Sequence, residues 1–128
     1  MNAVQWNDQT PIFRQLKEKV IELIMDGEVI EGEAVPSVRQ VAADYQINPL
    51  TVSKAYQELV DDEVLEKKRG LGMFVTEGAK EKLYAEERRI FLQQEWPRII
   101  KRIQRLGINM DELTSEINQS TEQSTGDR

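Results

Sequence analysis

The chain has 128 residues, of which 17 are basic and 23 acidic, and its net charge at pH 7 is −6. It contains no cysteine and no histidine, which excludes disulfide frameworks, zinc sites with thiolate or imidazole ligands, and catalytic triads built on imidazole. No segment is strongly basic, so any contact with nucleic acid must come from a local patch.

The first predicted helix covers residues 11–26. Thr10 is the expected N-cap, and Pro11 suits the first helical position, where a missing N–H costs nothing. Gly27 supplies a left-handed stop. The apolar residues recur at helical spacing and are Ile12, Phe13, Leu16, Val20, Leu23 and Ile24.

A second, short helix is predicted from Ser37, its N-cap, to about Asp44. Ser37 and Gln40 have the spacing of a capping box, in which each side chain bonds a free backbone amide at the position of the other. Its expected inner side consists of Val38, Val41 and Ala42. A tight connection over residues 45–47 follows.

The third predicted helix begins with Asn48 as N-cap and Pro49 at the first helical position. Its buried stripe is expected to contain Val52, Ala55, Tyr56, Leu59 and Val60. Its outer face then consists of Leu50, Thr51, Ser53, Lys54 and Gln57.

A β-hairpin is predicted next, with strands over Val64–Lys68 and Met73–Thr76. Gly70 and Gly72 lie in the turn, where they allow positive φ. Two helices joined by a short turn and followed by a two-stranded wing make a winged helix-turn-helix.

The segment from residue 78 is predicted to be helical, with an apolar seam at heptad spacing over about two heptads. Pro97 lies inside this seam and either kinks or divides the helix. Gly107 ends it, and Asn109 caps a short final helix in which Glu112 completes a second capping box. The seam residues are Leu92, Trp96, Ile99, Ile103 and Leu106.

The seam has two interpretations, a helix packed on its own domain or a homodimer interface. The second helix of a helix-turn-helix is typically a recognition helix that reads DNA. We favour dimerisation because one such short helix reads few base pairs, whereas a two-fold dimer reads two half-sites. The expected fold is therefore mainly α with a small β-hairpin. A winged helix-turn-helix domain over residues 10–77 precedes a helical dimerisation segment over 78–117, and the polar tail over 118–128 is expected to be disordered.

Two stretches of the sequence resemble a known family. The stretches "PIFRQLKEKVIELIMDGEV" and "PSVRQVAADYQINPLTVSKAYQELVDDEVLEKKRGLGMFV" resemble the N-terminal domain of GntR-type bacterial transcription regulators, over roughly residues 11–75. The proline starts, the Pro-Ser…Arg entry, the Thr-Val-x-x-Ala-Tyr helix and the Gly-x-Gly wing fall in the family's order. The short C-terminal segment resembles the YtrA-type subfamily.

The resemblance implies a set of DNA-contacting positions. Arg39 is expected to contact a phosphate or a base edge. The start of the recognition helix, its exposed side and the wing tip provide the others, which are Asn48, Pro49, Leu50, Thr51, Ser53, Lys54, Lys68, Arg69 and Gly70. Two positions depart from the usual pattern, because Pro49 stands where the family often has arginine and Leu50 where a polar residue is more usual. Few side chains of this helix are then expected to contact the bases directly, and Leu50 is placed to contact a thymine methyl group.

The resemblance implies a transcription regulator, most simply a repressor that binds a two-fold symmetric double-stranded DNA operator as a homodimer. The rival interpretation is a winged-helix protein–protein interaction module without sequence-selective DNA binding.

No catalytic residue, metal site or cofactor is expected, since the acidic loop "DGEVIEGE" fails the spacing of a calcium loop. Whether a small-molecule effector binds is left open. With no signal peptide and no run of ~18 apolar residues, we expect a cytoplasmic location and no membrane contact.

Overall fold

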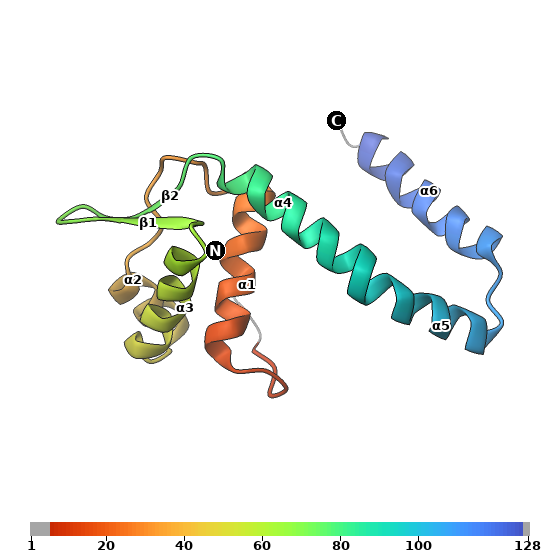
Figure 1. Cartoon of the computed structure of the whole chain (residues 1–128), viewed down its shortest axis with the longest axis horizontal. Coiled ribbons are helices and arrows are strands. Elements are labelled where there is room, and N and C mark those ends of the chain that lie inside the picture. Colours follow the sequence, from red (N-terminus) through yellow and green to blue (C-terminus); the bar gives the residue numbers. More distant parts are fainter. Residues whose placement is uncertain (1–5, 127–128) are drawn as a thin grey trace. The chain divides into compact units, whose positions relative to one another are not determined.

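The computed structural model describes residues 6–126 of the chain (Figure 1). Within this part of the chain, residues 6–86 form one compact unit and residues 87–126 form a second. The elements in chain order are α1 (Ile12–Met25), α2 (Val38–Tyr45), α3 (Pro49–Asp61), β1 (Leu65–Lys68), β2 (Gly72–Val75), α4 (Ala79–Ile90), the π-helical turn η1 (Phe91–Glu95), α5 (Trp96–Leu106) and α6 (Met110–Gly126).

The core of the first unit lies between α1, α2, α3 and the hairpin. Its largest fully buried side chain is Tyr56 of α3. The predicted stripes of the three helices are confirmed, because their central members are buried together; these are Leu16, Val20, Ile24, Val41, Ala42, Val52, Ala55, Tyr56 and Leu59. Val60 is only partly buried at the edge of this core.

The helix caps fix where α2 and α3 begin. Ser37 accepts a hydrogen bond from the backbone N–H of Gln40 at 3.1 Å, which confirms the predicted cap. The reciprocal half of the capping box does not form, because the Gln40 side chain bonds Asp44 in the next turn instead. Asn48 accepts from the N–H of Leu50 at 2.9 Å and caps α3 as predicted.

The predicted cap of α1 is wrong. Pro11 occupies the N-cap position and makes no side-chain cap bond. Thr10 turns away because its N–H and hydroxyl both approach the Asn7 side-chain oxygen, at 3.3 and 3.4 Å. The side chain of Gln15 then reaches back to the carbonyl of Thr10 at 2.7 Å, so the turn before the helix is held by side chains instead.

The wing contains one more extended segment than predicted. Strands β1 and β2 pair antiparallel, with Leu65 opposite Val75. The loop before α2 joins the free edge of β2 through a bridge between Ala34 and Phe74. Val35 donates its N–H to the carbonyl of Met73 at 2.9 Å, and Val75 donates to Glu33 at 2.9 Å. This pairing protects the edge of the hairpin.

The beginning of α4 belongs to the first unit. Ala79 and Leu83 are buried in its core, and the carboxylate of Glu31 accepts from the backbone N–H groups of Gly78 at 2.6 Å and Lys80 at 3.1 Å. Lys82 donates to the carbonyl of Asp62 at 2.8 Å. These contacts explain why the division between units falls within α4, later than the boundary after residue 77 that we expected.

The second unit shows how the chain accommodates Pro97. Proline has no N–H and its ring clashes with the carbonyl of the preceding turn. The turn before it is widened, because Trp96 donates its N–H to Phe91, five residues back. The backbone at Glu95 and Trp96 stays in the right-handed helical region, so Pro97 neither ends the helix nor divides it into separate pieces. A π turn of this kind inserts one extra residue into the helix.

The end of α5 and the start of α6 follow the predicted signals. Gly107 has φ +66°, and Asn109 accepts from the N–H of Asp111 at 2.7 Å. Helix α6 runs to Gly126, beyond the residue 118 at which an irregular tail is predicted, and residues 127–128 lie outside the described part. Over residues 6–126 no helix has both the length and the apolar character needed to cross a membrane.

Candidate nucleic-acid interface

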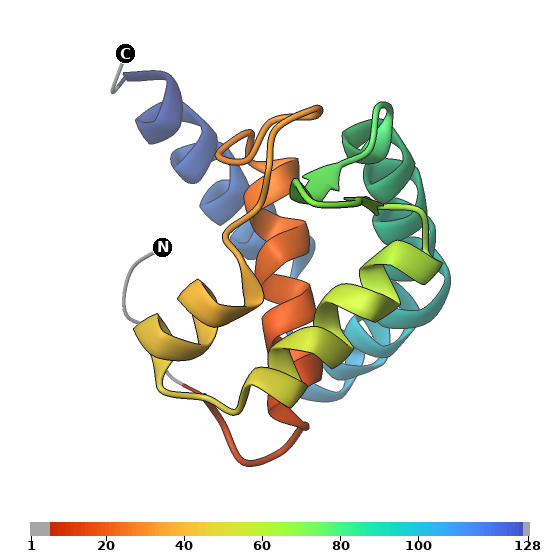
Figure 2. The same ribbon diagram turned by 90° about the vertical axis from the view of Figure 1, so that its left-hand side faces the viewer.

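The predicted DNA-contacting residues lie on three parts of the first unit. In Figure 1, α2, the N-terminal end of α3 and the turn of the hairpin all lie on the left-hand side of this unit. Figure 2 turns this side toward the viewer. The fold therefore brings one end of the third helix and the wing tip to the same side, although about twenty residues separate them in sequence.

The start of α3 exposes an apolar side chain. Its backbone N–H groups are already bonded, because Asn48 accepts from Leu50 with its side chain and from Thr51 and Val52 with its carbonyl, at 2.9 and 3.3 Å. Leu50 is 76% exposed, and Thr51 beside it is half-buried. Exposing the apolar side chain of a leucine to water is unfavourable in free energy, so a contact that removes it from water is favourable.

The ammonium group of Lys54 is oriented by an aromatic ring. Its Nζ atom lies 4.0 Å from the centroid of the Phe13 ring in α1, a cation–π contact. Ser53, next to it, is exposed. The lysine therefore does not extend freely into solvent, as the sequence suggests, but is held over the junction of α1 and α3.

A lysine of the wing is also held over an aromatic ring. Lys68 places its Nζ atom 4.6 Å from the centroid of the Phe74 ring on the opposite strand. Arg69 and Gly70 form the turn, in which Gly70 has φ +78° and Leu71 donates its N–H to the carbonyl of Lys68 at 2.9 Å. Two lysines of the predicted set are thus each anchored on a phenylalanine, with their charge left at the surface.

Arg39 lies in the first turn of α2 and is exposed. Because Ser37 caps this turn, the position of the Arg39 backbone is fixed. Together with Lys54, Lys68 and Arg69 it makes up the basic residues of the predicted set, in a chain whose net charge is −6.

Acidic residues at the C-terminal end of α3 form ion pairs with a lysine of α1. Lys17 forms ion pairs with Asp62 at 2.9 Å and with Glu58 at 3.4 Å. Burial opposes the charged form of Lys17, but the hydrogen bonds and charges of Asp62 and Glu58 outweigh it and raise the pKa of Lys17. The cluster joins α1 to the C-terminal end of α3, away from Leu50 and the helix start.

Sequence reasoning missed two features of this unit. Leu71, at the wing tip, is 72% exposed, and its position between two glycines was the available signal. Trp6 packs edge-on against Tyr45 of α2, with ring centroids 6.1 Å apart. Nothing in the residue pattern around Trp6 pointed to this contact, since it depends on how the N-terminal segment folds back.

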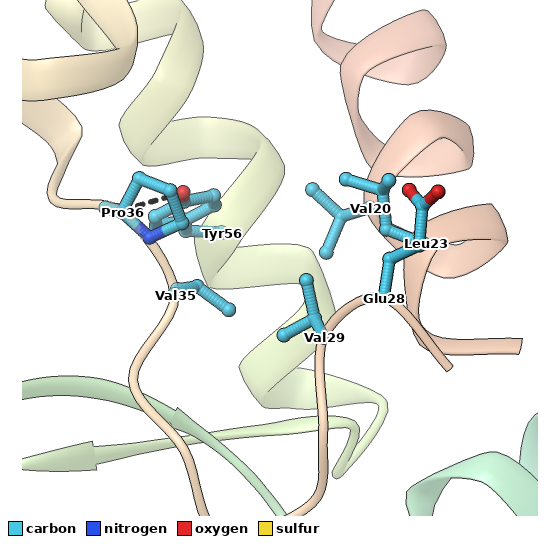
Figure 3. A pocket seen from close by; sticks show the side chains of 7 residues that line it. All are labelled: Val20, Leu23, Glu28, Val29, Val35, Pro36 and Tyr56. Atoms are coloured by element: carbon cyan, nitrogen blue, oxygen red, sulfur yellow. Dashed lines mark hydrogen bonds between the residues drawn. The ribbon is translucent and has the colours of Figure 1, made fainter. Parts of the chain in front are cut away.

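A small apolar pocket lies on the first unit, between α1, α3 and the loop that joins α1 to α2 (Figure 3). Its volume is about 170 Å³, and it is lined by Val20, Leu23, Glu28, Val29, Val35, Pro36 and Tyr56. Glu28 is the one charged side chain in this lining. Within the described part of the chain, no group of acidic residues could hold a metal ion.

The predicted seam residues lie on η1 and α5 in the second unit. Ile99 is 37% exposed and Leu106 63% exposed. Trp96 and Ile103 are half-buried, and the ring of Trp96 stacks on Phe91, with centroids 6.3 Å apart. Leu92 is exposed as well. The opposite side of α5 contains Arg98, Lys101 and Arg105, so the helix is strongly amphipathic.

Comparison with known proteins gives consistent results. The sequence model of the family described as "Bacterial regulatory proteins, gntR family" matches residues 13–75. The HTH-type transcriptional repressor YtrA of Bacillus subtilis is 32% identical over 113 residues, which cover 88% of this chain and 86% of YtrA. A GntR family transcriptional regulator from Listeria monocytogenes has a similar structure, with a TM-score of 0.71 and 25% identity, over 89% of this chain and 98% of that one. For YtrA from Sulfolobus acidocaldarius, a GntR-family transcription factor, the TM-score is 0.56 and the identity 29%, over 95% of this chain and 97% of that one.

Proposed function

This chain belongs to the GntR family of bacterial regulatory proteins, and we propose that it represses transcription by binding a two-fold symmetric operator as a homodimer. Family membership makes it a DNA-binding winged helix-turn-helix transcription regulator. It also confirms the prediction that the chain is not an enzyme. The YtrA-type resemblance is confirmed by matches that extend beyond the winged domain into the C-terminal helices.

The observation that supports the proposed DNA contacts most directly is the pair of ring-anchored lysines. Lys54 and Lys68 come from the recognition helix and the wing, and each is held on an aromatic ring. A cation oriented before binding loses less conformational entropy when it meets a phosphate. The proposed phosphate contacts are these two lysines with Arg39 and Arg69.

The start of α3 is proposed to enter the major groove. Thr51 and Ser53 provide hydroxyl groups, and Leu50 provides the apolar contact suited to a thymine methyl. Asn48 and Pro49 fix the helix start, while Gly70 lets the wing approach the backbone closely. Because few polar side chains face the bases, we expect phosphate contacts to supply much of the affinity.

Repression and dimerisation are proposed together. The B. subtilis relative is described as a repressor, and an operator that overlaps a promoter is blocked simply by occupancy, in the cytoplasm where a bacterial promoter lies. A dimer would place two recognition helices on half-sites spaced by one or more turns of DNA. Its interface is proposed on the seam of Leu92, Trp96, Ile99, Ile103 and Leu106. No effector is part of this proposal.

The decisive experiment is selection of bound sequences from a randomised duplex library, with the wild type, Arg39→Ala and Lys101→Ala compared. Lys101 lies on α5, so Lys101→Ala removes the same charge outside the winged domain. We expect a two-fold symmetric motif for the wild type and for Lys101→Ala, with strongly reduced enrichment for Arg39→Ala. An asymmetric motif would refute dimeric operator binding. No enrichment for the wild type would favour the rival function of a protein–protein interaction module, which the exposed Leu50 and the acidic net charge would then explain.

A further inference from the structure

The second unit has an apolar stripe that its own chain leaves partly exposed. The π turn brings Phe91 against Trp96, five residues further on, since the extra residue shifts the preceding turn by one position. From Trp96 onward the spacing of three and four residues continues through α5. The apolar stripe defined in this way consists of Phe91, Trp96, Ile99, Ile103 and Leu106.

One flank of the apolar stripe has a charge of each sign. Glu95 precedes Trp96, and Arg102 precedes Ile103, so the two charged residues lie seven residues, or two turns, apart along the same edge. Both are exposed. No ion pair of the described residues involves either. The opposite flank contains Ile100, which is uncharged.

We propose that the apolar stripe pairs with the same stripe of a second copy in antiparallel orientation, with Glu95 of each copy facing Arg102 of the other. This inference rests on the proposed homodimer and specifies its geometry. Trp96 then packs against the partner's Ile99, and Phe91 against the partner's Ile103. The two-fold axis passes through the seam between Trp96 and Ile99, so each charge pair occurs twice.

The charges select this orientation. In an antiparallel helix pair, residues on the same flank face each other across the seam, whereas in a parallel pair each flank faces the opposite one. A parallel pair would place Glu95 opposite the uncharged Ile100, so no ion pair would form. An antiparallel pair shifted by one heptad would set Arg102 against itself, and like charges at these positions are unfavourable.

The test is a charge-swap experiment read by sedimentation velocity, without DNA. Glu95→Arg alone places two arginines at each contact, and Arg102→Glu alone places two glutamates there. Each variant is expected to dimerise at least about tenfold more weakly than the wild type, since two attractive pairs become repulsive. An equimolar mixture of the two variants restores both attractive pairs and is expected to dimerise like the wild type. The double variant Glu95→Arg/Arg102→Glu is expected to recover for the same reason.

Two controls keep the outcomes separate. Lys101→Glu reverses a charge on the far side of α5 and is expected to leave dimerisation unchanged, while helix content measured by circular dichroism confirms that each variant is folded. If both single variants dimerise like the wild type, or if the mixture stays monomeric, the antiparallel pairing is wrong although a dimer exists. If the wild type itself sediments as a monomer at all concentrations, the proposed homodimer fails first.

Discussion

The phenol of Tyr56 donates a hydrogen bond of 2.6 Å to the backbone carbonyl of Pro36. Tyr56 lies on the buried side of α3, and Pro36 directly precedes the cap of α2, so one bond joins the recognition helix to the entry of its partner helix (Figure 3). Burial raises the pKa of the Tyr56 phenol far above its usual value. It therefore remains a donor throughout the physiological range, and the relative position of α2 and α3 does not depend on pH through this bond.

Replacing Tyr56 by phenylalanine tests the contribution of this bond. The ring remains in the core, but the carbonyl of Pro36 loses its donor, so we expect the free energy of unfolding to fall by about 1 kcal/mol. Urea denaturation followed by circular dichroism measures the change. Tyr84→Phe is the matched control, because Tyr84 is 60% exposed, and it should leave the midpoint unchanged. An equal effect of both substitutions would mean that the Tyr56 bond contributes nothing specific.

The cap of α3 allows stability and DNA binding to be separated. Asn48→Ala removes the acceptor for the N–H of Leu50 and is expected to destabilise the domain by about 1 kcal/mol. Asn48→Asp retains the cap, so stability should stay close to that of the wild type. The added negative charge, however, faces the phosphates in the proposed complex and should weaken DNA binding. Thermal melts and fluorescence anisotropy with the selected duplex check the two effects. Normal DNA affinity for Asn48→Asp would place the helix start away from DNA.

The winged domain could be predicted from the sequence because its signals are local. Asn48 and Pro49 mark a helix start by chemistry that needs no tertiary context, and Gly70 marks a turn. The signals that failed depend on neighbours that sequence alone does not reveal. Thr10 lost its capping role to a competing acceptor on Asn7. The heptad pattern could not show that Pro97 widens the preceding turn, which brings Phe91 against Trp96.

The candidate site was predictable in type but not in geometry. The family pattern identified Lys54 and Lys68 as exposed cations. Their anchoring on Phe13 and Phe74 could not be read from the sequence, because each pair joins elements whose packing decides the contact. The bridge between Ala34 and Phe74 was missed for the same reason, since the loop before α2 has no strand periodicity.

Acid should weaken the attachment of α4 through Glu31. The hydrogen bonds from the backbone N–H groups of Gly78 and Lys80 lower the pKa of the Glu31 carboxyl in the folded protein. A group with a depressed pKa stabilises the fold above its unfolded pKa, and this stabilisation is lost as the pH falls through the folded value. We therefore expect Glu31→Gln to lower the melting temperature at pH 7 but not at a pH where Glu31 is protonated in both states.

Melting curves of the wild type and Glu31→Gln between pH 7 and pH 3 measure this convergence. Glu33→Gln is the control, because the Glu33 side chain is exposed and Glu33 enters the wing through its backbone carbonyl. A constant difference between wild type and Glu31→Gln at every pH would show that the substitution acts by something other than the charge of Glu31.

The ring under Lys54 should tune DNA affinity without changing the number of phosphate contacts. Lys54→Ala removes one proposed phosphate contact, so the slope of log affinity against log salt should become shallower by about 0.9. Phe13→Leu keeps the lysine but removes the cation–π contact, which at a surface is worth about 0.5–1 kcal/mol. Its affinity should therefore fall by no more than about fivefold, with an unchanged slope. Binding isotherms at several salt concentrations separate the two results, and equal slopes for Lys54→Ala and wild type would remove Lys54 from the phosphate contacts.

The apolar stripe should be required for operator binding only through the dimer. Ile99→Asp places a charge in the middle of the proposed seam, where burial of an unpaired carboxylate is costly, and Trp96→Ala removes its largest side chain. Both variants should sediment as monomers at concentrations where the wild type is dimeric. Because the core of the first unit contains neither residue, its melting should be retained.

DNA binding then distinguishes an interface from a structural role. A duplex with a single half-site should bind the wild type and Ile99→Asp equally per subunit, whereas a two-fold operator should bind Ile99→Asp far more weakly than the wild type. Lys101→Asp, which puts the same side chain on the opposite face of α5, should behave like the wild type on both duplexes. If Ile99→Asp remains a dimer and retains its operator affinity, the subunits associate through another surface, and the exposed stripe on α5 needs a different partner.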